Sequence, residues 1–334
     1  MKILLIGSSG TLSKAVRTAL LDTHQHEVIA IHRGHHSMEK HPHLQELILD
    51  IYDDVQNNQL RHLDYDVVID FIAYQKHDLE KRIQVLNKNI QQYIFISTVV
   101  ALNHENTHIV DEQLKLGNPY SLYGQAKAEC ENYLRSLTDF PYTIIRPSQT
   151  YSEDRIPLSV KPKSCWPVVS RMIRNLPVIV HGDGQSLWSS MHAVDFAQAL
   201  LGILGNTETL YKVIHIQNGQ SHTWDQVYQH LAKLLKVEYH PIYLSSADLS
   251  HIKKYDFYGS IFADKRYSHI FKIEELLKYT PSYQTQIPLE LGLDKYLEHM
   301  NQHPELKVED ADFDYFCDEL VKLHQNYVES LEKL

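Results

Sequence analysis

Short apolar runs alternate with helix-like segments through the first half of the chain. The runs are almost continuously apolar, which is typical of strands that are buried on both faces of a sheet. Strands that alternate with helices in this way predict a parallel, doubly wound α/β sheet. The predicted strands lie at residues 2–7, 27–32, 46–50, 66–72, 93–98 and 142–147, and the predicted helices at residues 11–22, 77–90 and 120–137.

The second half has a mixed pattern, with loop-rich stretches at residues 148–167 and 181–190. We expect a smaller, mixed α/β substrate lobe, so that the predicted domains are residues 1–150 and 151–334, with some later segments returning to the first domain. The last residues predict an amphipathic helix. The other predicted elements are a helix near 166–176, a strand at 177–182, a helix at 193–204, a strand at 212–217 and a helix capped by Thr223.

The charge and the cysteines narrow the class of protein. The net charge of −10 argues against nucleic acid or an anionic membrane as a partner, since both select basic surfaces. No signal peptide and no apolar stretch of roughly 20 residues is present, so we expect a cytoplasmic protein with a small-molecule substrate. The three cysteines indicate no disulfide framework, and the histidine-rich stretch 24–43 has no zinc-ligand spacing. We therefore expect solvated histidines and no metal.

A glycine loop, "GSSGTLS", follows the first predicted strand. Gly7 permits a sharp turn, and Gly10 lets a ligand approach the backbone closely. The unpaired amides at the start of the next helix suit a pyrophosphate, so the loop predicts a Rossmann-type NAD(P)-binding domain. The predicted cofactor contacts here are Gly7, Ser9, Gly10, Thr11 and Leu12, while Ser13 stands at the third small position. A purely structural turn is the alternative.

The end of the second predicted strand bears on cofactor choice. An NAD site usually has an acidic residue there, whereas this chain has His32 followed by Arg33. A cation without a carboxylate favours a 2′-phosphate, so we expect NADP slightly in preference to NAD. An arginine without a ligand role is the alternative. Asp50 and Ile51, after the third strand, are expected at the adenine.

Tyr123 and Lys127 are four residues apart on a predicted helix and therefore share one face. An ammonium group beside a phenol lowers the pKa of the phenol, which suits a general acid/base. Ser97 and Thr98, at the end of a strand, supply hydroxyls that could polarise the reacting oxygen. Chance alone can produce a Tyr-x-x-x-Lys pair. The evidence for a catalytic pair is therefore its position after that strand and downstream of the glycine loop.

Together these motifs and "IIRPSQTY" resemble the extended or atypical short-chain dehydrogenases/reductases of the NAD-dependent epimerase/dehydratase family. The resemblance implies that Tyr123 is the acid/base, that Lys127 lowers its pKa and binds ribose, and that Thr98, with Ser97 beside it, polarises the oxygen. It also implies that Pro147 and Ser148 lie beside the nicotinamide. We expect Ala73 and Tyr123 to contact the cofactor too.

The segment "MHAVDFAQAL" resembles the "IHVDDVA" segment of the same family, with Asp195 as a structural residue at a helix start. Family members that act on sugar nucleotides usually carry an arginine four residues before the matching histidine, where this chain has Trp188. Trp188 could stack on a substrate ring or fill the core of the lobe. Tyr151 and Arg155 are further candidate substrate contacts. The cations that could replace the missing arginine are Arg155, Lys161, Lys163, Arg171 and Arg174.

Three functions remain open at this point. The first is an NAD(P)-dependent epimerase/dehydratase-type oxidoreductase acting on a sugar-nucleotide-like or other polar substrate, although Val99 and Val100 beside Thr98 count against dehydration. The second is an NADP(H)-dependent carbonyl reductase with an exchanging cofactor. The third is a non-catalytic nucleotide-sensing protein, against which the intact acid/base set argues. The resemblance implies a homodimer formed through two sheet-flanking helices.

Overall fold

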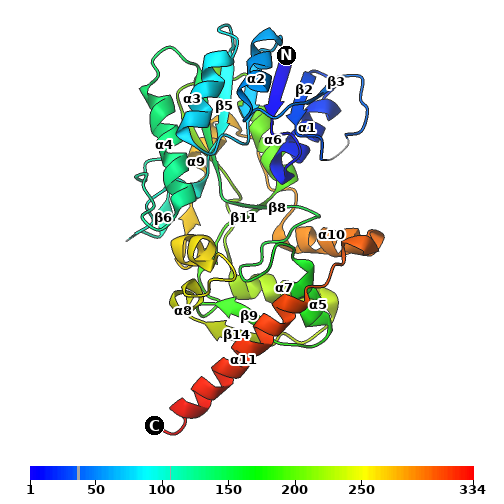
Figure 1. The fold of residues 1–334 in the computed structure, drawn as a ribbon, viewed down its shortest axis with the longest axis vertical. Coiled ribbons are helices and arrows are strands. Elements are labelled where there is room, and N and C mark those ends of the chain that lie inside the picture. Colours follow the sequence, from blue (N-terminus) through cyan, green and yellow to red (C-terminus); the bar gives the residue numbers. More distant parts are fainter. Residues whose placement is uncertain (36–37, 106) are drawn as a thin grey trace.

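A seven-stranded parallel sheet forms the upper part of the molecule in the computed structural model, which describes residues 1–35, 38–105 and 107–334 (Figure 1). Its strands run in the order β3-β2-β1-β4-β5-β7-β12, and every neighbouring pair is parallel. The predicted doubly wound α/β fold is thus confirmed. The strands are β1 (Lys2–Ile6), β2 (Glu27–His32), β3 (Leu44–Ile48), β4 (Val67–Asp70), β5 (Gln92–Ile96), β7 (Tyr142–Pro147) and β12 (Val213–Ile216).

Helices cover both faces of this sheet, which explains why its central strands are apolar throughout. On one face, α1 (Thr11–Asp22), α6 (Ala193–Ile203) and α9 (Glu274–Tyr279) share a hydrophobic core with Ile3 and Leu5 of β1. On the other face, Leu4 and Ile6 pack in a core with α3 (Lys76–Val85) and α4 (Leu122–Ser136). Successive strand residues point to opposite faces, so each must be apolar when both faces are covered.

The lower part of the molecule is a lobe with its own hydrophobic core (Figure 1). Its main elements are α5 (Trp166–Ile173), β9 (Val178–His181), α7 (Trp224–Leu235), β14 (Pro241–Leu244), α10 (Leu289–Gln302) and α11 (Ala311–Leu331). Thr223 caps α7 by accepting a hydrogen bond from the Gln226 amide. The chain does not divide cleanly at residue 150, because α6 and β12 follow the first lobe elements and lie on the sheet.

Several short elements lie where the sequence pattern predicted loops. Stretch 148–167 contains β8, and stretch 181–190 contains β10 and the start of β11. Runs of two or three residues are too short to produce a detectable pattern. The remaining elements are α2 (Asp54–Asn57), β6 (Ile109–Val110), β8 (Gln149–Tyr151), β10 (Leu187–Trp188), β11 (Ser190–His192), β13 (His222–Thr223), α8 (Ser246–Ser250), a π-helix (Tyr258–Lys265), β15 (Ile270–Phe271) and 3₁₀ turns at Asn58–His62, Val99–Ala101, Thr207–Thr209 and Pro304–Leu306.

The histidine-rich stretch differs in part from the expectation. Residues 36 and 37 lie outside the described residues, and His32 is buried on β2 rather than solvated. Within the described ranges, no group of three or more His, Cys, Asp or Glu side chains is arranged to hold a metal ion. No helix in the same ranges has the length and apolar content needed to cross a bilayer.

Candidate functional site

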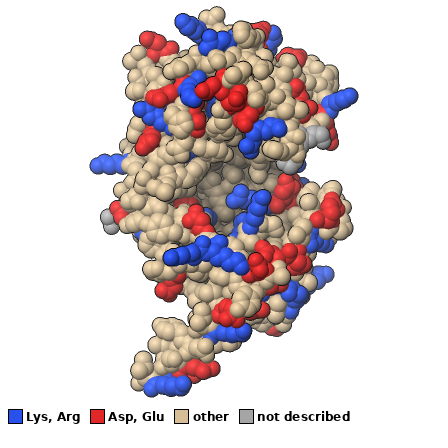
Figure 2. All heavy atoms as spheres, viewed as in Figure 1, with Lys and Arg blue, Asp and Glu red and all other residues tan. Residues whose placement is uncertain are grey.

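A cleft of about 470 Å³ opens at the carboxyl ends of the strands, around the point between β1 and β4 where the strand order reverses. Open α/β sheets bind ligands at this point. Figure 2 shows the molecule hollowed between its upper and lower parts, with Lys and Arg side chains on the lower side of the hollow. The predicted residues that line the cleft are Gly7, Ser9, Gly10, Thr11, Leu12, Arg33, Asp50, Ile51, Ser97, Thr98, Tyr123, Lys127, Pro147, Ser148 and Arg155.

The glycine loop turns tightly across the end of β2. The amides of Gly7 and Ser8 both donate to the Ile31 carbonyl, at 3.1 and 2.9 Å. Gly7 has a φ of +83°, and a Cβ there would lie 2.4 Å from Cγ2 of Ile72, so the turn requires glycine. At Gly10, by contrast, an added Cβ meets only the Ser13 hydroxyl at 3.5 Å. Packing of the protein therefore does not require glycine at this position.

Ser13, which stands in place of a third glycine, ties the loop to the first turn of α1. Its Oγ accepts from the Gly10 amide at 2.9 Å and donates to the Gly10 carbonyl at 3.1 Å. The substitution therefore fixes the N-terminus of α1. The amides of Thr11 and Leu12 have no carbonyl in a preceding helical turn and point toward the cleft end of the helix, where an anion is favoured.

The far end of the cleft carries Arg33, Asp50 and Ile51. Arg33 is exposed, but His32 is buried and its Nε2 lies 2.7 Å from Oε1 of Glu46. Its other ring nitrogen accepts from the Gly34 amide at 3.1 Å. Both ring nitrogens of His32 thus have partners within the protein, although the residue borders the cleft, and Arg33 is the exposed cation at this end.

Tyr123 lies in the first turn of α4, whose N-terminus is capped by Ser121. Burial raises the pKa of Tyr123 to about 12, with the neighbouring Tyr74 adding to the rise and the Thr98 hydroxyl opposing it. Burial also lowers the pKa of Lys127 to about 8. The Lys127 ammonium donates to the carbonyls of Ala73 (2.9 Å) and Ile96 (2.7 Å). The effect of Lys127 on the pKa of Tyr123 stays a prediction, because Tyr123 lines the open cleft and is 46% exposed.

The two adjacent hydroxyls after β5 face different partners. Thr98 lines the cleft, and its Oγ1 accepts from the Val100 amide at 3.2 Å. Ser97 also borders the cleft, but its hydroxyl donates to Oε1 of the buried Glu131 at 2.6 Å. Thr98 is therefore the hydroxyl of this pair that is better placed to meet a ligand.

The turn after β4 supplies cleft residues that the sequence motifs missed. Asp70 accepts from the amides of Ile72 and Ala73, both at 3.0 Å, and so shapes the turn. Ile72 and Tyr74 line the cleft, whereas the predicted contact Ala73 is fully buried and does not. The ring of Tyr74 lies 6.4 Å from that of Tyr123. The sequence feature that could have predicted this turn is Asp70, an aspartate at the end of a buried strand.

Of the three predicted substrate contacts, one lines the cleft and two are buried away from it. Arg155 is exposed and lines the cleft. Trp188 is 3% exposed and packs against His269 and Phe271 at ring distances of 4.9 and 5.5 Å, so it fills the core of the lobe. Tyr151 is fully buried, and its hydroxyl donates to a backbone carbonyl at 3.4 Å. Neither aromatic residue lines the cleft.

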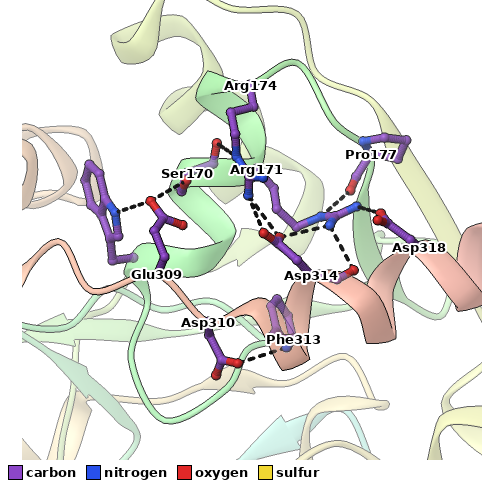
Figure 3. Close-up of polar contacts among 10 residues, drawn as sticks. Ser170, Arg171, Arg174, Pro177, Glu309, Asp310, Phe313, Asp314 and Asp318 are labelled. Carbon is purple, nitrogen blue, oxygen red and sulfur yellow. Dashed lines mark hydrogen bonds and ion pairs between the residues drawn. The ribbon is translucent and has the colours of Figure 1, made fainter.

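The other candidate cations have partners elsewhere or lie outside the cleft lining. Arg171 pairs with Asp314 and Asp318 at 3.0 and 2.7 Å, and Arg174 pairs with Asp314 at 2.8 Å (Figure 3). Lys161 donates to the carbonyls of residues 162 and 163, at 3.1 and 3.2 Å. Of the five cations that could replace the missing arginine, Arg155 is the one that lines the cleft among the described residues.

A buried acid whose charge affects the pKa of Tyr123 was not predicted. Asp264, in the π-helix, is 5% exposed, and its Oδ1 has no hydrogen-bond partner among the described residues. Its charge contributes to the raised pKa of Tyr123. The adjacent Ala263 carbonyl accepts from Asn118 at 2.9 Å, which ties the π-helix to the segment before α4. Asp264 lies about 140 residues from Tyr123 in the sequence, and no motif joins them.

Asp195 has the structural role expected of it. It lies in the first turn of α6, is buried, and accepts from the amides of Gln286 and Ile287 at 2.9 and 3.1 Å. It therefore joins α6 to the segment that precedes α10.

Comparison with known proteins decides the family. A family model described as the NAD dependent epimerase/dehydratase family matches residues 3–216, which contain the glycine loop, Thr98, Tyr123 and Lys127. The chain belongs to this family. Among curated proteins, a 2'-dehydrokanamycin reductase from Streptomyces kanamyceticus is 20% identical over 290 residues, which covers 85% of this chain and 80% of the relative.

Solved structures of epimerases share the fold of this family member. An epimerase from Methanothermobacter thermautotrophicus superposes with a TM-score of 0.74 at 15% identity and covers 92% of this chain and 94% of its own. A UDP-glucose 4-epimerase from Thermotoga maritima, solved with UDP-glucose, has a TM-score of 0.70 at 20% identity and covers 90% and 99%. A UDP-glucuronic acid 4-epimerase from Bacillus cereus, in complex with UDP-glucuronic acid and NAD, has a TM-score of 0.72 at 18% identity, with 90% and 99% covered.

Proposed function

We propose that the protein is an NAD(P)-dependent oxidoreductase of the epimerase/dehydratase type. The single observation that carries this proposal is the meeting of Thr98, Tyr123 and Lys127 in the cleft that begins at the glycine loop. A non-catalytic nucleotide sensor would not need an acid/base set in its binding cleft. Family membership supports the same conclusion.

The residues of the cleft suit a dinucleotide along its length. Gly10 leaves room for a pyrophosphate at the N-terminus of α1, where the amides of Thr11 and Leu12 can donate to it. Asp50 and Ile51 would border the adenine, and Pro147 and Ser148 would border the nicotinamide. When bound, the nicotinamide supplies or accepts the hydride.

The acid/base residues would act on a substrate hydroxyl or carbonyl. The Tyr123 hydroxyl would give a proton to the substrate oxygen in reduction and take it back in oxidation, while the Thr98 hydroxyl would donate a hydrogen bond to that oxygen. Lys127, anchored by the Ala73 and Ile96 carbonyls, would hold its ammonium at the nicotinamide ribose. Arg155 would meet the part of the substrate farthest from the reacting carbon.

The proposal is tested by purifying the protein without added cofactor, denaturing it and identifying any released nucleotide by mass spectrometry. Stoichiometric NAD supports an epimerase-type enzyme that recycles a bound cofactor, and addition of UDP-glucose would then test for transient reduction of that cofactor. An empty protein that binds NADPH or NADH supports an exchanging reductase. A protein that releases neither nucleotide and binds neither contradicts the proposal.

A carbonyl reductase with an exchanging cofactor is the second candidate. Trp188 occupies the core instead of supplying a diphosphate-binding arginine, which weakens the case for a nucleotide-sugar substrate. The curated relative is named as a reductase. Arg33, without a cleft carboxylate at the end of β2, would favour NADP. A homodimer is part of either proposal.

Replacing Arg33 with alanine tests the cofactor preference. If the guanidinium binds a 2′-phosphate, Arg33→Ala is expected to raise the Kd for NADPH about 10- to 100-fold, because a charge-assisted hydrogen bond contributes about 1.5–3 kcal/mol. The Kd for NADH should change little. Isothermal titration of both nucleotides measures this, with the exposed Arg61→Ala, outside the cleft, as the matched control. Equal weakening of both nucleotides, or of neither, would refute the NADP preference.

A further inference from the structure

A closed turn at residues 152–155 carries the one cation that lines the cleft from the lobe side. Ser152 and Arg155 exchange two backbone hydrogen bonds, at 2.9 and 3.1 Å, and the Asp154 amide donates to the Ser152 hydroxyl at 3.3 Å. Arg155, the last residue of the turn, is exposed and lines the same cleft as Tyr123. The closed turn therefore fixes the backbone from which the Arg155 side chain extends.

The two acids of this turn have partners other than Arg155. Oε1 of Glu153 lies 3.6 Å from Nε2 of the buried His192, at the N-terminus of α6. Oδ1 of Asp154 lies 3.3 Å from Nε2 of His299 on α10. Among the ion pairs formed by the described residues, none involves Arg155. An arginine that follows two carboxylates is thus left unpaired at the cleft, where its charge is available to an anionic ligand.

Two hydroxyl groups line the cleft on the chain segment that leads to this turn. Ser148 and Thr150 are two residues apart, and both line the cleft. Residues with this spacing point to the same side of an extended chain. The Ser148 Oγ is buried and has no hydrogen-bond partner among the described residues. A buried hydroxyl without a partner is destabilising, and an oxygen atom of a bound ligand would supply the missing hydrogen bond.

The nearby lysines are bound within the protein, which limits the charge that this site can neutralise. Lys161 donates to two backbone carbonyls. Lys265 donates to the Ser260 carbonyl at 2.6 Å and lies 3.7 Å from Oδ2 of Asp264. Neither lysine lines the cleft. One guanidinium matches a carboxylate in charge and in bidentate geometry, whereas a phosphate monoester has a charge of about −1.5 to −2 at neutral pH.

The other charges that line the cleft have different places. Arg33 and Asp50 lie together at its far end, and Lys127 is anchored by two backbone carbonyls. Asp50 is the one acidic side chain among the described residues that line the cleft. No carboxylate of the lining therefore neutralises Arg155 on the lobe side.

We propose that Arg155, with the hydroxyls of Ser148 and Thr150, binds a carboxylate of the substrate, which is a hydroxy or keto acid and not a nucleotide sugar. This inference rests on the proposed function, because Tyr123 would act on the hydroxyl or carbonyl group of the same molecule. The carboxylate itself is held and stays unchanged in the reaction. The site thus selects its substrate by a single negative charge.

Isothermal titration with matched ligands tests this proposal. The protein is saturated with the reduced nucleotide that it binds, which prevents turnover of hydroxy compounds. It is titrated with D-gluconate, D-glycerate and L-lactate, with their neutral counterparts D-glucitol, glycerol and propylene glycol, and with glycerol phosphate and UDP-glucose. We expect at least one acid to bind about tenfold more tightly than its neutral counterpart, because charge-assisted hydrogen bonds are the stronger ones.

Arg155→Gln should remove this preference for the acid. Lys163→Gln is the matched control, since Lys163 is an exposed cation of the same stretch that does not line the cleft. It should leave the preference intact. Circular dichroism and the thermal unfolding midpoint show whether each variant folds.

A further pair of variants tests the arrangement that leaves Arg155 unpaired. His299→Ala should release Asp154 toward Arg155 and weaken binding of the acid by up to about fivefold, as expected for competition by an exposed ion pair. Adding Asp154→Asn in the same chain should restore binding, which a general loss of structure would not allow. His303→Ala is the control, because His303 contacts Glu305 at 3.2 Å instead of the turn.

Several results would overturn the proposal. These are acids that bind no better than their neutral counterparts, tighter binding of glycerol phosphate or UDP-glucose, and a preference for the acid that persists in Arg155→Gln. Weaker binding of the nucleotide itself by Arg155→Gln would also overturn it, since Arg155 would then contact the cofactor. Failure of the proposed function is seen separately, as a wild-type protein that binds no nucleotide.

Discussion

Tyr123→Phe is expected to lower turnover by roughly 10²–10⁴-fold, because it removes the hydroxyl that we propose carries the proton. Dinucleotide affinity should change much less than turnover, since the glycine loop, Arg33 and Lys127 are untouched. The substrate is to be found by screening UDP-sugars and sugar ketones with the wild-type protein. Full turnover in Tyr123→Phe would contradict the acid/base assignment.

Tyr120→Phe is the matched control for this variant. It removes the same hydroxyl three residues earlier, where the group donates to Glu105 at 2.7 Å and does not line the cleft. Turnover of this control should be close to that of the wild type.

The raised pKa of Tyr123 predicts opposite pH dependences for the two directions of reaction. With a pKa of about 12, the phenol is protonated at neutral pH and can act as an acid, so carbonyl reduction should be supported there and should fall at alkaline pH. Alcohol oxidation needs the deprotonated phenolate, so its rate should rise with pH. Initial rates measured in both directions across the pH range check this. An oxidation rate that falls as pH rises would argue against Tyr123 as the base.

Glu131→Gln is expected to lower the free energy of unfolding by about 3–5 kcal/mol. Glu131 and Arg146 are both fully buried and form a bidentate pair at 2.9 and 2.6 Å, which also receives the Ser97 hydroxyl. Removing the carboxylate leaves the Arg146 guanidinium buried without its counter-charge. Urea unfolding followed by circular dichroism measures the loss.

Two variants show whether the loss comes from the unpaired charge. Glu129→Gln, exposed on the same helix, should change stability by less than about 0.5 kcal/mol. The double variant Glu131→Leu/Arg146→Met removes both charges and should recover much of the loss, because apolar pairs can replace buried ion pairs. A Glu131→Gln protein as stable as the wild type would show that the guanidinium is satisfied by other contacts.

The parallel sheet and the cleft residues that follow its strands could be predicted from the sequence. Strands buried on both faces are continuously apolar, and cleft residues in this fold occupy set places in chain order. Tertiary packing decided what the sequence left open. Trp188 could have stacked on a substrate or filled the core, and the choice depended on where His269 and Phe271 lie.

Other residues were beyond local sequence patterns. The sequence near Arg171 shows no acidic partner, because the aspartates that form ion pairs with it lie more than 140 residues later in the chain. Asp264 belongs to no motif and reaches the neighbourhood of Tyr123 only through the fold of the lobe.

The return of β12 to the sheet has a consequence for how the two parts of the molecule can move. The chain leaves the sheet after β7, comes back for α6 and β12, leaves again for α7 and β14, and returns once more for α9. If one flexible segment joined the sheet to the lobe, the cleft between them could open widely. Several chain segments cross between the two parts instead, and together they restrain that motion. We therefore expect the cleft to admit its ligands through small adjustments of its rim loops. For the same reason, a chain cut at residue 150 would lose an edge strand and a covering helix, and would expose β7 to aggregation.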